Sequence, residues 1–402
     1  MEYFDSDVPN IPDYRLSEKQ FLLTTCATTT PSTKEQLVGE ILESIKTESL
    51  GSYYKYLTTE FPQYFPLDEE LSLKLNSTNE EEIEKLKASI KEAEGDDETE
   101  LDVTQCYIKL AEYYTKIIDR ENSIETYQKA LELPQSTGSK IDILLTLARL
   151  EFFFNDYSNA KVYLDQVKIL IEKGGDWERR NRFKMYSGIF LMATRNFSEA
   201  SKLLIDSLAT FTSTEICSYD QVAHYAIVSG VLTLDRVNLK EKIMDSPEIL
   251  SIYSSAPHLE PLINLTNSLY TCQYNYFFKY LLESHDELLV SNKYLYNHSN
   301  YFLREMRCKA YGQLLESYKS LSIKSMAENF SISPEFLDKD LCKFIPNKKL
   351  NCVIDKVNGI IETNRPDNKN NQYHLLIKQG DSLLTKLQKY GAAVKLSGAE
   401  RV

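Results

Sequence analysis

The chain has 402 residues, which is enough for two or three domains of about 150 residues each. Its 13 Gly and 12 Pro are too few for a turn-rich β protein or for long disordered linkers, so we expect a mainly helical fold. It contains no run of about 18 apolar residues, and its acidic first residues differ from a signal peptide. We therefore expect a soluble intracellular protein that does not bind membranes.

The first distinctive element is an acidic helix within residues 79–100. This window holds ten Asp and Glu against three Lys, and it therefore contributes much of the formal net charge of −13. Ile83, Leu86 and Ile90 recur at spacings of three and four residues, which predicts a helix with one thin apolar stripe that ends near Gly95. We interpret residues 1–100 as an N-terminal helical segment that contains this acidic helix.

Residues 101–215 carry the signature of helical repeats. The stretch 107–134 matches the tetratricopeptide (TPR) pattern, with Ser123 at the small position that follows a polar turn. Ala160 and Ala200 follow similar turns, so the repeat period is 37 and then 40 residues. Because one helix pair cannot bury its apolar face alone, these repeats predict a right-handed TPR-like solenoid.

Residues 216–320 are expected to continue as helices and to form the helical part of the next domain. Ser246-Pro247 and Ala256-Pro257 predict two helix starts, since Pro is favoured in the first helical turn. The remaining helix boundaries in this region are less clear from the sequence.

Residues 321–366 predict a winged helix, which is a pair of short helices followed by a β-hairpin. The second helix is expected to begin at Ser333-Pro334. The inward apolar residues of the two helices are Ile323, Met326, Ala327, Phe330, Phe336, Leu337, Leu341, Phe344 and Ile345. The hairpin is predicted from alternating apolar residues before an Asn358-Gly359 turn, a two-residue turn type that needs positive φ at both positions.

A winged helix in a basic region raises the question of nucleic-acid binding. Residues 301–402 hold 17 Lys and Arg against 11 Asp and Glu. The polar residues of the second helix, however, are Glu335, Asp338, Lys339, Asp340 and Lys343. Because this helix has a net charge of −1 and no Arg to contact guanine or phosphate, we expect no nucleic-acid partner.

Residues 367–402 predict a C-terminal amphipathic helix and tail. Its apolar stripe consists of Tyr373, Leu376, Ile377, Gly380, Leu383, Leu384, Leu387, Tyr390, Gly391 and Val394. The stripe either folds back onto the preceding domain or packs against helices of other chains. The candidate partner-binding residues are Ile354, Asn358, Gly359, Ile360 and Ile361 in the hairpin, and Tyr373, Leu376, Ile377, Leu383, Leu384, Leu387 and Val394 in the stripe.

No motif in the sequence predicts catalytic chemistry. The seven Cys include no C-x-x-C pair, and the five His show no metal-ligand spacing. Phosphate-binding Gly loops are absent too, and Glu283, His285 and Asp286 would not share one helix face. We therefore expect no catalytic, cofactor-binding or metal-binding residues, and we predict that the chain is not an enzyme.

TPR-like helices that run into a winged helix resemble the PCI-domain family, which occurs in the proteasome lid, the COP9 signalosome and eukaryotic initiation factor three. Residues 171–184, 203–213 and above all 343–391 resemble one branch of it more closely. That branch is the family of non-ATPase subunit seven of the 26S proteasome regulatory-particle lid, in its fungal form. The ETNRPD segment, residues 362–367, is the most specific element of this resemblance.

The resemblance implies a non-catalytic scaffold subunit of the 26S proteasome lid, needed for lid assembly and ubiquitin-dependent protein degradation in the cytoplasm and nucleus. It implies a hetero-oligomer in which the winged helix pairs edge to edge with other PCI subunits and the C-terminal helix enters a bundle. The other implied partners are the deubiquitinase subunit pair of the lid and the proteasome base. The alternative is a PCI scaffold subunit of the COP9 signalosome or of initiation factor three. A deubiquitinase would need a metal-binding His-x-His pattern, which the sequence lacks.

Overall fold

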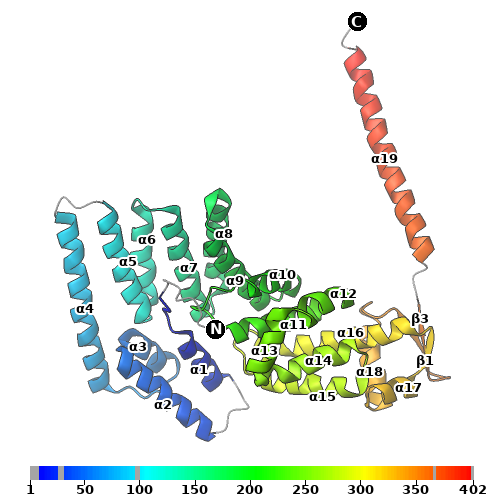
Figure 1. Cartoon of the computed structure of the whole chain (residues 1–402), viewed down its shortest axis with the longest axis horizontal. Coiled ribbons are helices and arrows are strands. Elements are labelled where there is room, and N and C mark those ends of the chain that lie inside the picture. The colour runs from blue at the N-terminus through cyan, green and yellow to red at the C-terminus, as the bar shows by residue number, and fades with distance from the viewer. Residues whose placement is uncertain (1–8, 26–30, 96–99, 365–367, 400–402) are drawn as a thin grey trace. The chain divides into compact units, whose positions relative to one another are not determined.

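The computed structural model describes residues 9–25, 31–95, 100–364 and 368–399. The chain divides into two compact units. Unit 1 comprises Met1–Gln273 and Phe277–Glu305, and unit 2 comprises Tyr274–Tyr276 and Met306–Val402. Helices make up most of the described chain, and its strands lie in one small sheet (Figure 1). The prediction of a helical-repeat fold followed by a winged helix and a long C-terminal helix is confirmed.

The helices up to Ser317 fall into three groups. The first group is α1 (Tyr14–Thr24), α2 (Pro31–Glu48), α3 (Gly51–Glu60) and α4 (Glu69–Gly95). The repeat helices are α5 (Glu100–Lys116), α6 (Arg120–Glu132), α7 (Thr137–Phe153), α8 (Tyr157–Gly174), α9 (Trp177–Ala193) and α10 (Phe197–Leu208). The third group is α11 (Tyr219–Thr233), α12 (Arg236–Leu239), η1 (Lys240–Met244), α13 (Pro247–Ser255), η2 (Pro257–Leu259), α14 (Glu260–Tyr270), α15 (Tyr274–Ser284), η3 (His285–Leu289), η4 (Tyr296–His298) and α16 (Ser299–Ser317).

The acidic helix is the C-terminal part of α4 and ends at Gly95, as predicted. Ile90 is buried, and Ile83 and Leu86 pack partly buried against the same apolar cluster, which also includes Leu110 of α5. The thin stripe therefore attaches α4 to the first repeat helix, while Glu80, Glu81, Glu82, Glu84 and Glu92 are exposed. Residues 96–99 of the acidic segment lie outside the described ranges.

The repeat helices pack against their neighbours in chain order, and α4 to α8 stand side by side (Figure 1). The small residues predicted at the close approaches, Ser123, Ala160 and Ala200, have no exposed surface. The hydroxyls of Ser123 and Thr115 lie 2.6 Å apart, which shows how closely α5 and α6 approach. The prediction of paired helices with small residues at their contacts is confirmed.

The three repeat turns share one backbone device that the sequence did not reveal. Ile118, Asn155 and Arg195 have φ of 60°, 61° and 68°. In each turn, the N–H of the next residue donates to the carbonyl five residues earlier, at 2.8–2.9 Å. This left-handed helix cap is most often made by Gly, but these turns make it without Gly, so no Gly signal marked them.

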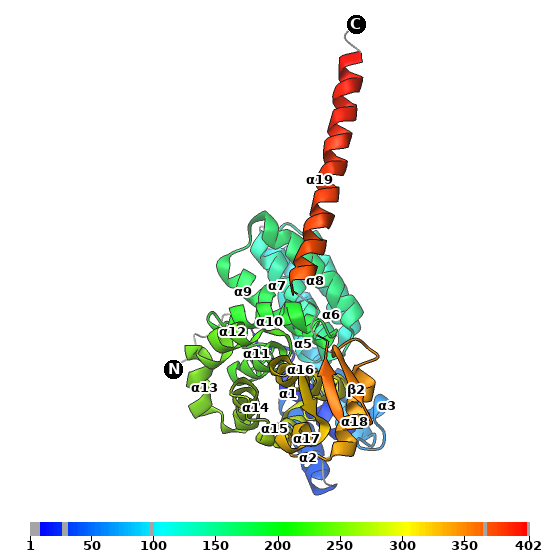
Figure 2. The same cartoon turned by 90° about the vertical axis from the view of Figure 1, so that its right-hand side faces the viewer.

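The winged helix of unit 2 has three strands instead of the predicted two. Its elements are β1 (Ser320–Ser322), α17 (Ile323–Asn329), α18 (Pro334–Phe344), β2 (Cys352–Asp355) and β3 (Ile360–Thr363), and the C-terminal helix is α19 (Asn368–Ala399). The Ser333 hydroxyl caps α18 by accepting the Phe336 N–H at 3.3 Å, as the Ser-Pro signal predicted. The strands lie next to α17 and α18 (Figures 1 and 2). Positions 365–367 of the ETNRPD segment lie outside the described residues.

Candidate partner-binding surfaces

The tip of the hairpin is built by an aspartate that the sequence analysis did not single out. The Asp355 carboxylate accepts the backbone N–H of Val357 at 2.9 Å and of Asn358 at 3.3 Å. It also accepts the side-chain amide of Asn358 at 2.7 Å. These three hydrogen bonds hold the pKa of the Asp355 carboxyl below its ordinary value.

The predicted two-residue turn is wrong in its length and in one backbone angle. Four residues, 356–359, connect β2 to β3, because Asp355 pairs with Ile360 at the end of the ladder. Gly359 has φ of 65°, whereas Asn358 is not among the residues with positive φ. The side chain of Asp355 stabilises the longer turn, so only Gly359 needs the left-handed conformation.

The sheet order is β1-β3-β2, so β3 is the central strand. It pairs antiparallel with β1, where Leu321 lies opposite Ile361, and with β2, where Ile354 lies opposite Ile361. The backbone of Ile360 and Ile361 is therefore already used within the chain. Only the outer edges of β1 and β2 remain for a partner strand, which moves the candidate edge away from β3.

The predicted hairpin residues differ in exposure. Ile361 is fully buried and belongs to the core of the domain, so its side chain cannot meet a partner while the wing is folded. Ile354, Gly359 and Ile360 are half-buried, and Asn358 is exposed.

Two valines of the wing are more accessible than the predicted isoleucines. Val353 is 54% exposed and Val357 is 93% exposed. Sequence analysis missed both of them. The alternation of Cys352 and Ile354 toward the core would have placed Val353 on the outer face.

Helix α18 packs as predicted except at one position. Leu337, Leu341 and Phe344 are buried, but Phe336 is 41% exposed, so the prediction that it points inward is wrong. The Arg307 guanidinium lies 5.7 Å from the centre of the Phe336 ring and donates to Asp340 at 2.7 Å. Phe336 is the third residue after the Ser333 cap, and this first-turn position faces the side of α18 that Arg307 covers.

Helix α19 presents the predicted apolar stripe to solvent. Its large members are between 58% and 72% exposed: Tyr373, Leu376, Ile377, Leu383, Leu384, Leu387, Tyr390 and Val394. Every described side chain of this helix is exposed. The described residues of the stripe are therefore not folded back onto the winged helix. Their apolar face is open to another chain.

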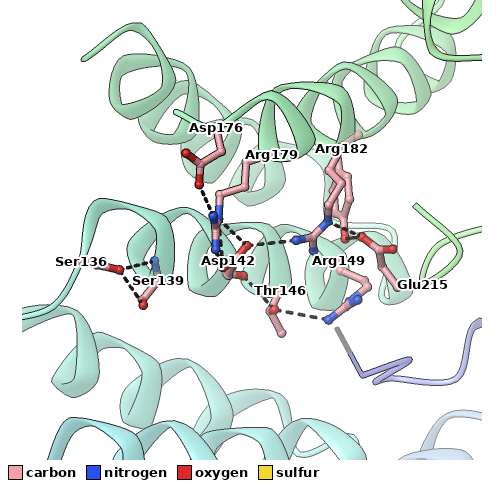
Figure 3. Close-up of polar contacts among 10 residues, drawn as sticks. Ser136, Ser139, Asp142, Thr146, Arg149, Asp176, Arg179, Arg182 and Glu215 are labelled. Atoms are coloured by element: carbon pink, nitrogen blue, oxygen red, sulfur yellow. Dashed lines mark hydrogen bonds and ion pairs between the residues drawn. The ribbon is translucent and has the colours of Figure 1, made fainter. Parts of the chain in front are cut away.

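An ion-pair network whose Arg182–Glu215 pair is buried joins α7, α9 and the segment after α10 (Figure 3). Arg182 of α9 donates to Glu215 and to Asp142, both at 2.9 Å, and only 2% of its side chain is exposed. Arg179 donates to the other oxygen of Asp142 at 2.7 Å and to Asp176 at 2.5 Å. Because Asp142 and Glu215 belong to other segments, these bonds fix α9 within unit 1 and support the repeat stack.

The described residues provide no group of three or more His, Cys, Asp or Glu that could hold a metal ion. Burial lowers the pKa of His224 to about 4, and His298 has its Nε2 2.7 Å from the carbonyl of Ala193. A cavity of about 880 Å³ in unit 1 includes Cys217 in its wall. Burial raises the pKa of that thiol well above its ordinary value, which is the opposite of an activated nucleophile.

No helix in the described ranges is long and apolar enough to cross a lipid bilayer.

Three family models match successive parts of the chain. Residues 68–242 match the model of 26S proteasome subunit RPN7, residues 282–365 match the PCI domain, and residues 372–394 match the C-terminal helix of 26S proteasome regulatory subunit RPN7/PSMD6. The third match coincides with the exposed helix α19.

Full-length relatives point the same way. The chain is 52% identical to the 26S proteasome regulatory subunit RPN7 of Saccharomyces cerevisiae, with 100% of this chain and 98% of the relative aligned. It is 43% identical to the corresponding Schizosaccharomyces pombe subunit, with 92% and 93% aligned. Similarity to COP9 signalosome complex subunit 1 of Arabidopsis thaliana is lower, at 22% identity over 50% of this chain and 45% of that protein.

Proposed function

We propose that this chain, which belongs to the family of 26S proteasome regulatory subunit RPN7, is a non-catalytic scaffold subunit of the proteasome lid. In this role it is needed for lid assembly and for ubiquitin-dependent protein degradation. The observation that carries the proposal is the 32-residue helix α19, whose large apolar side chains are exposed along the stretch that matches the family's own C-terminal helix.

Helix α19 is the main contact element in this proposal. Fully burying one Leu contributes roughly 1.5–3 kcal/mol, and the stripe contains Leu376, Leu383, Leu384 and Leu387. Each of these leucines is more than half exposed. Its burial energy is therefore realised only when another chain covers it. Covering the exposed part of the four leucines therefore contributes roughly 4–7 kcal/mol to docking, against side-chain ordering costs of about 0.5–1.5 kcal/mol per residue.

The wing supplies a second contact in the proposal. Strand β2 lies at the edge of the sheet, and Val353 is exposed on it. Addition of a partner strand to this edge would satisfy its unpaired backbone groups and cover the valine. Asn358 and Gly359 take part through the turn that orients β2, while Ile354 and Ile360 border the exposed face.

The proposed partners are other PCI subunits, the deubiquitinase subunit pair of the lid and the proteasome base, in a hetero-oligomer found in the cytoplasm and nucleus. We also propose the division into residues 1–100, 101–215, 216–320, 321–366 and 367–402. The winged-helix elements α17, α18, β2 and β3 fall inside the fourth segment, which supports it, whereas β1 of the same sheet begins one residue before it, at Ser320.

Affinity purification of the tagged full-length chain from its own cells, followed by mass spectrometry, tests the proposal. We expect the lid subunits to be recovered together with the chain. Recovery of COP9 signalosome or initiation-factor subunits instead would contradict it. The non-catalytic part is tested separately, because hydrolysis of ubiquitin chains by the isolated pure protein would refute it.

A further inference from the structure

Two glycines, Gly380 and Gly391, interrupt the exposed stripe of α19. The neighbours of Gly380 at i−4, i−3, i+3 and i+4 are all large and apolar, namely Leu376, Ile377, Leu383 and Leu384, whereas those of Gly391 include Gln388 and Lys395. On a helix these four positions surround position i, because 3.6 residues complete a turn. Each of the four is between 58% and 67% exposed. The helix surface therefore has a depression at Gly380 with four large apolar side chains as its rim.

The isolated chain gives no reason for Gly at this position. A Cβ at Gly380 would meet nothing within 4 Å, and the residue lies inside α19 without a positive φ. Gly is less favourable than Ala in a helix interior, so an exposed helical Gly normally weakens the helix. What Gly380 provides is space on the outer surface, which is useful only to a group that comes from another molecule.

Four apolar side chains around a central Gly leave room for one large side chain of a facing helix, much as the four residues of a hole receive a knob in knobs-into-holes packing. We infer that Gly380 is the floor of a socket for one large apolar side chain on an amphipathic helix of another lid subunit. This inference rests on the proposed function, and it adds the specific residue and the chemistry of the partner side chain.

Charge indicates which helix can dock there. Helix α19 carries five Lys and one Asp, whereas the whole chain has a formal net charge of −13. A second copy of α19 would bring like charges together, so the helix of the partner should be acidic on its polar side.

The experiment is co-expression of the full-length chain with the other lid subunits of its own organism, with incorporation measured on native gels. Gly380→Leu fills the socket, and Ser382→Leu adds the same side chain to the opposite face of α19. We expect Gly380→Leu to reduce incorporation at least tenfold and Gly380→Ala to reduce it less. Ser382→Leu should stay within twofold of wild type. Incorporation of Gly380→Leu at the wild-type level would overturn the socket.

A further variant separates this inference from the proposed function. Leu383→Asp places a charge on the stripe, so it should abolish incorporation whether or not the socket exists. Normal incorporation of Leu383→Asp would remove the proposed role of α19 itself. If Leu383→Asp abolishes incorporation and Gly380→Leu does not, the role of α19 in docking stands and only the socket is refuted.

A basic amphipathic helix can also lie on a membrane surface. Vesicles of phosphatidylserine and phosphatidylcholine are the probe for this possibility. We expect no binding of the wild-type chain. Vesicle binding that Leu383→Asp removes, together with normal lid incorporation of Gly380→Leu, would overturn the inference in favour of a membrane surface.

Discussion

Gly359→Val tests whether the wing is held in shape by one left-handed residue. Gly359 has φ of 65°, and a Cβ at this position would meet nothing within 4 Å. The cost of the substitution is therefore backbone strain alone, which for an L-residue in this region is about 1–2 kcal/mol. For a domain of about 60–100 residues, a loss of 1 kcal/mol in unfolding free energy lowers the melting temperature by about 4–8 °C. The melting temperature of unit 2 should therefore fall by about 4–16 °C.

Calorimetry measures that shift, and labelling of Cys352 measures opening of the wing itself. Cys352 is buried in β2, so its thiol reacts only when the strand opens. A loss of 1–2 kcal/mol should raise its labelling rate about 5–30-fold by mass spectrometry. Gly359→Asn is the matched control, since Asn tolerates the left-handed region and should change the rate little.

Gly359→Val should also reduce lid incorporation while leaving the helical content nearly unchanged. Equal labelling of Cys352 in the Val and Asn variants would refute the reasoning about backbone strain. Normal incorporation of a variant with a demonstrably opened wing would show that the wing is not an interface.

Two further predictions concern buried charges in unit 1. Lys293 is buried and donates to Ser17, Phe152 and Phe153, and this burial lowers its pKa to about 7. The folded state therefore holds fewer protons than the unfolded state between pH 7 and 10. This single group should make wild-type stability rise by about 1.4 kcal/mol per pH unit relative to Lys293→Met. Denaturant unfolding of both proteins from pH 7 to 9 measures this, and equal slopes would contradict it. Glu215→Gln should destabilise unit 1 by about 3 kcal/mol, because it leaves the buried Arg182 with Asp142 as its only carboxylate. Denaturant unfolding against the exposed control Glu172→Gln measures the effect, and a loss below about 1 kcal/mol would show that the pair is not needed.

The repeat stack could be predicted because its signal is local. Ser123, Ala160 and Ala200 follow polar turns at spacings of 37 and 40 residues, and all three are fully buried. The caps at Ile118 and Arg195 could not be predicted, since their residue types do not favour positive φ and the following helix imposes it.

The wing was predicted only in part, because its hairpin has a local signal and its third strand does not. The hairpin followed from alternation and from Gly359, but β1 has only three residues, Ser320–Ser322, and forms because β3 offers it an edge. The strand that pairs with β1 is 40 residues away in the sequence, as Leu321 and Ile361 show, so the residues of β1 alone do not predict a strand. The same non-local cause made Phe336 unpredictable, since its exposure depends on Arg307 of α16.

The stripe of α19 was the clearest signal in the C-terminal region, because Leu376, Leu383 and Leu387 recur at helical spacing. The sequence could not decide between folding back and docking elsewhere, since both bury the same face. Exposure of these residues in the structure favours docking to another chain.

Truncation before Gln372 tests this central claim most directly. The removed apolar residues Tyr373, Leu376 and Leu383 are exposed, so the melting temperature of the isolated protein should stay within about 2 °C of wild type. Reconstitution with the other lid subunits should fail, because the main docking face is gone. Unimpaired incorporation of the truncated chain, or a large drop in its melting temperature when isolated, would contradict the account.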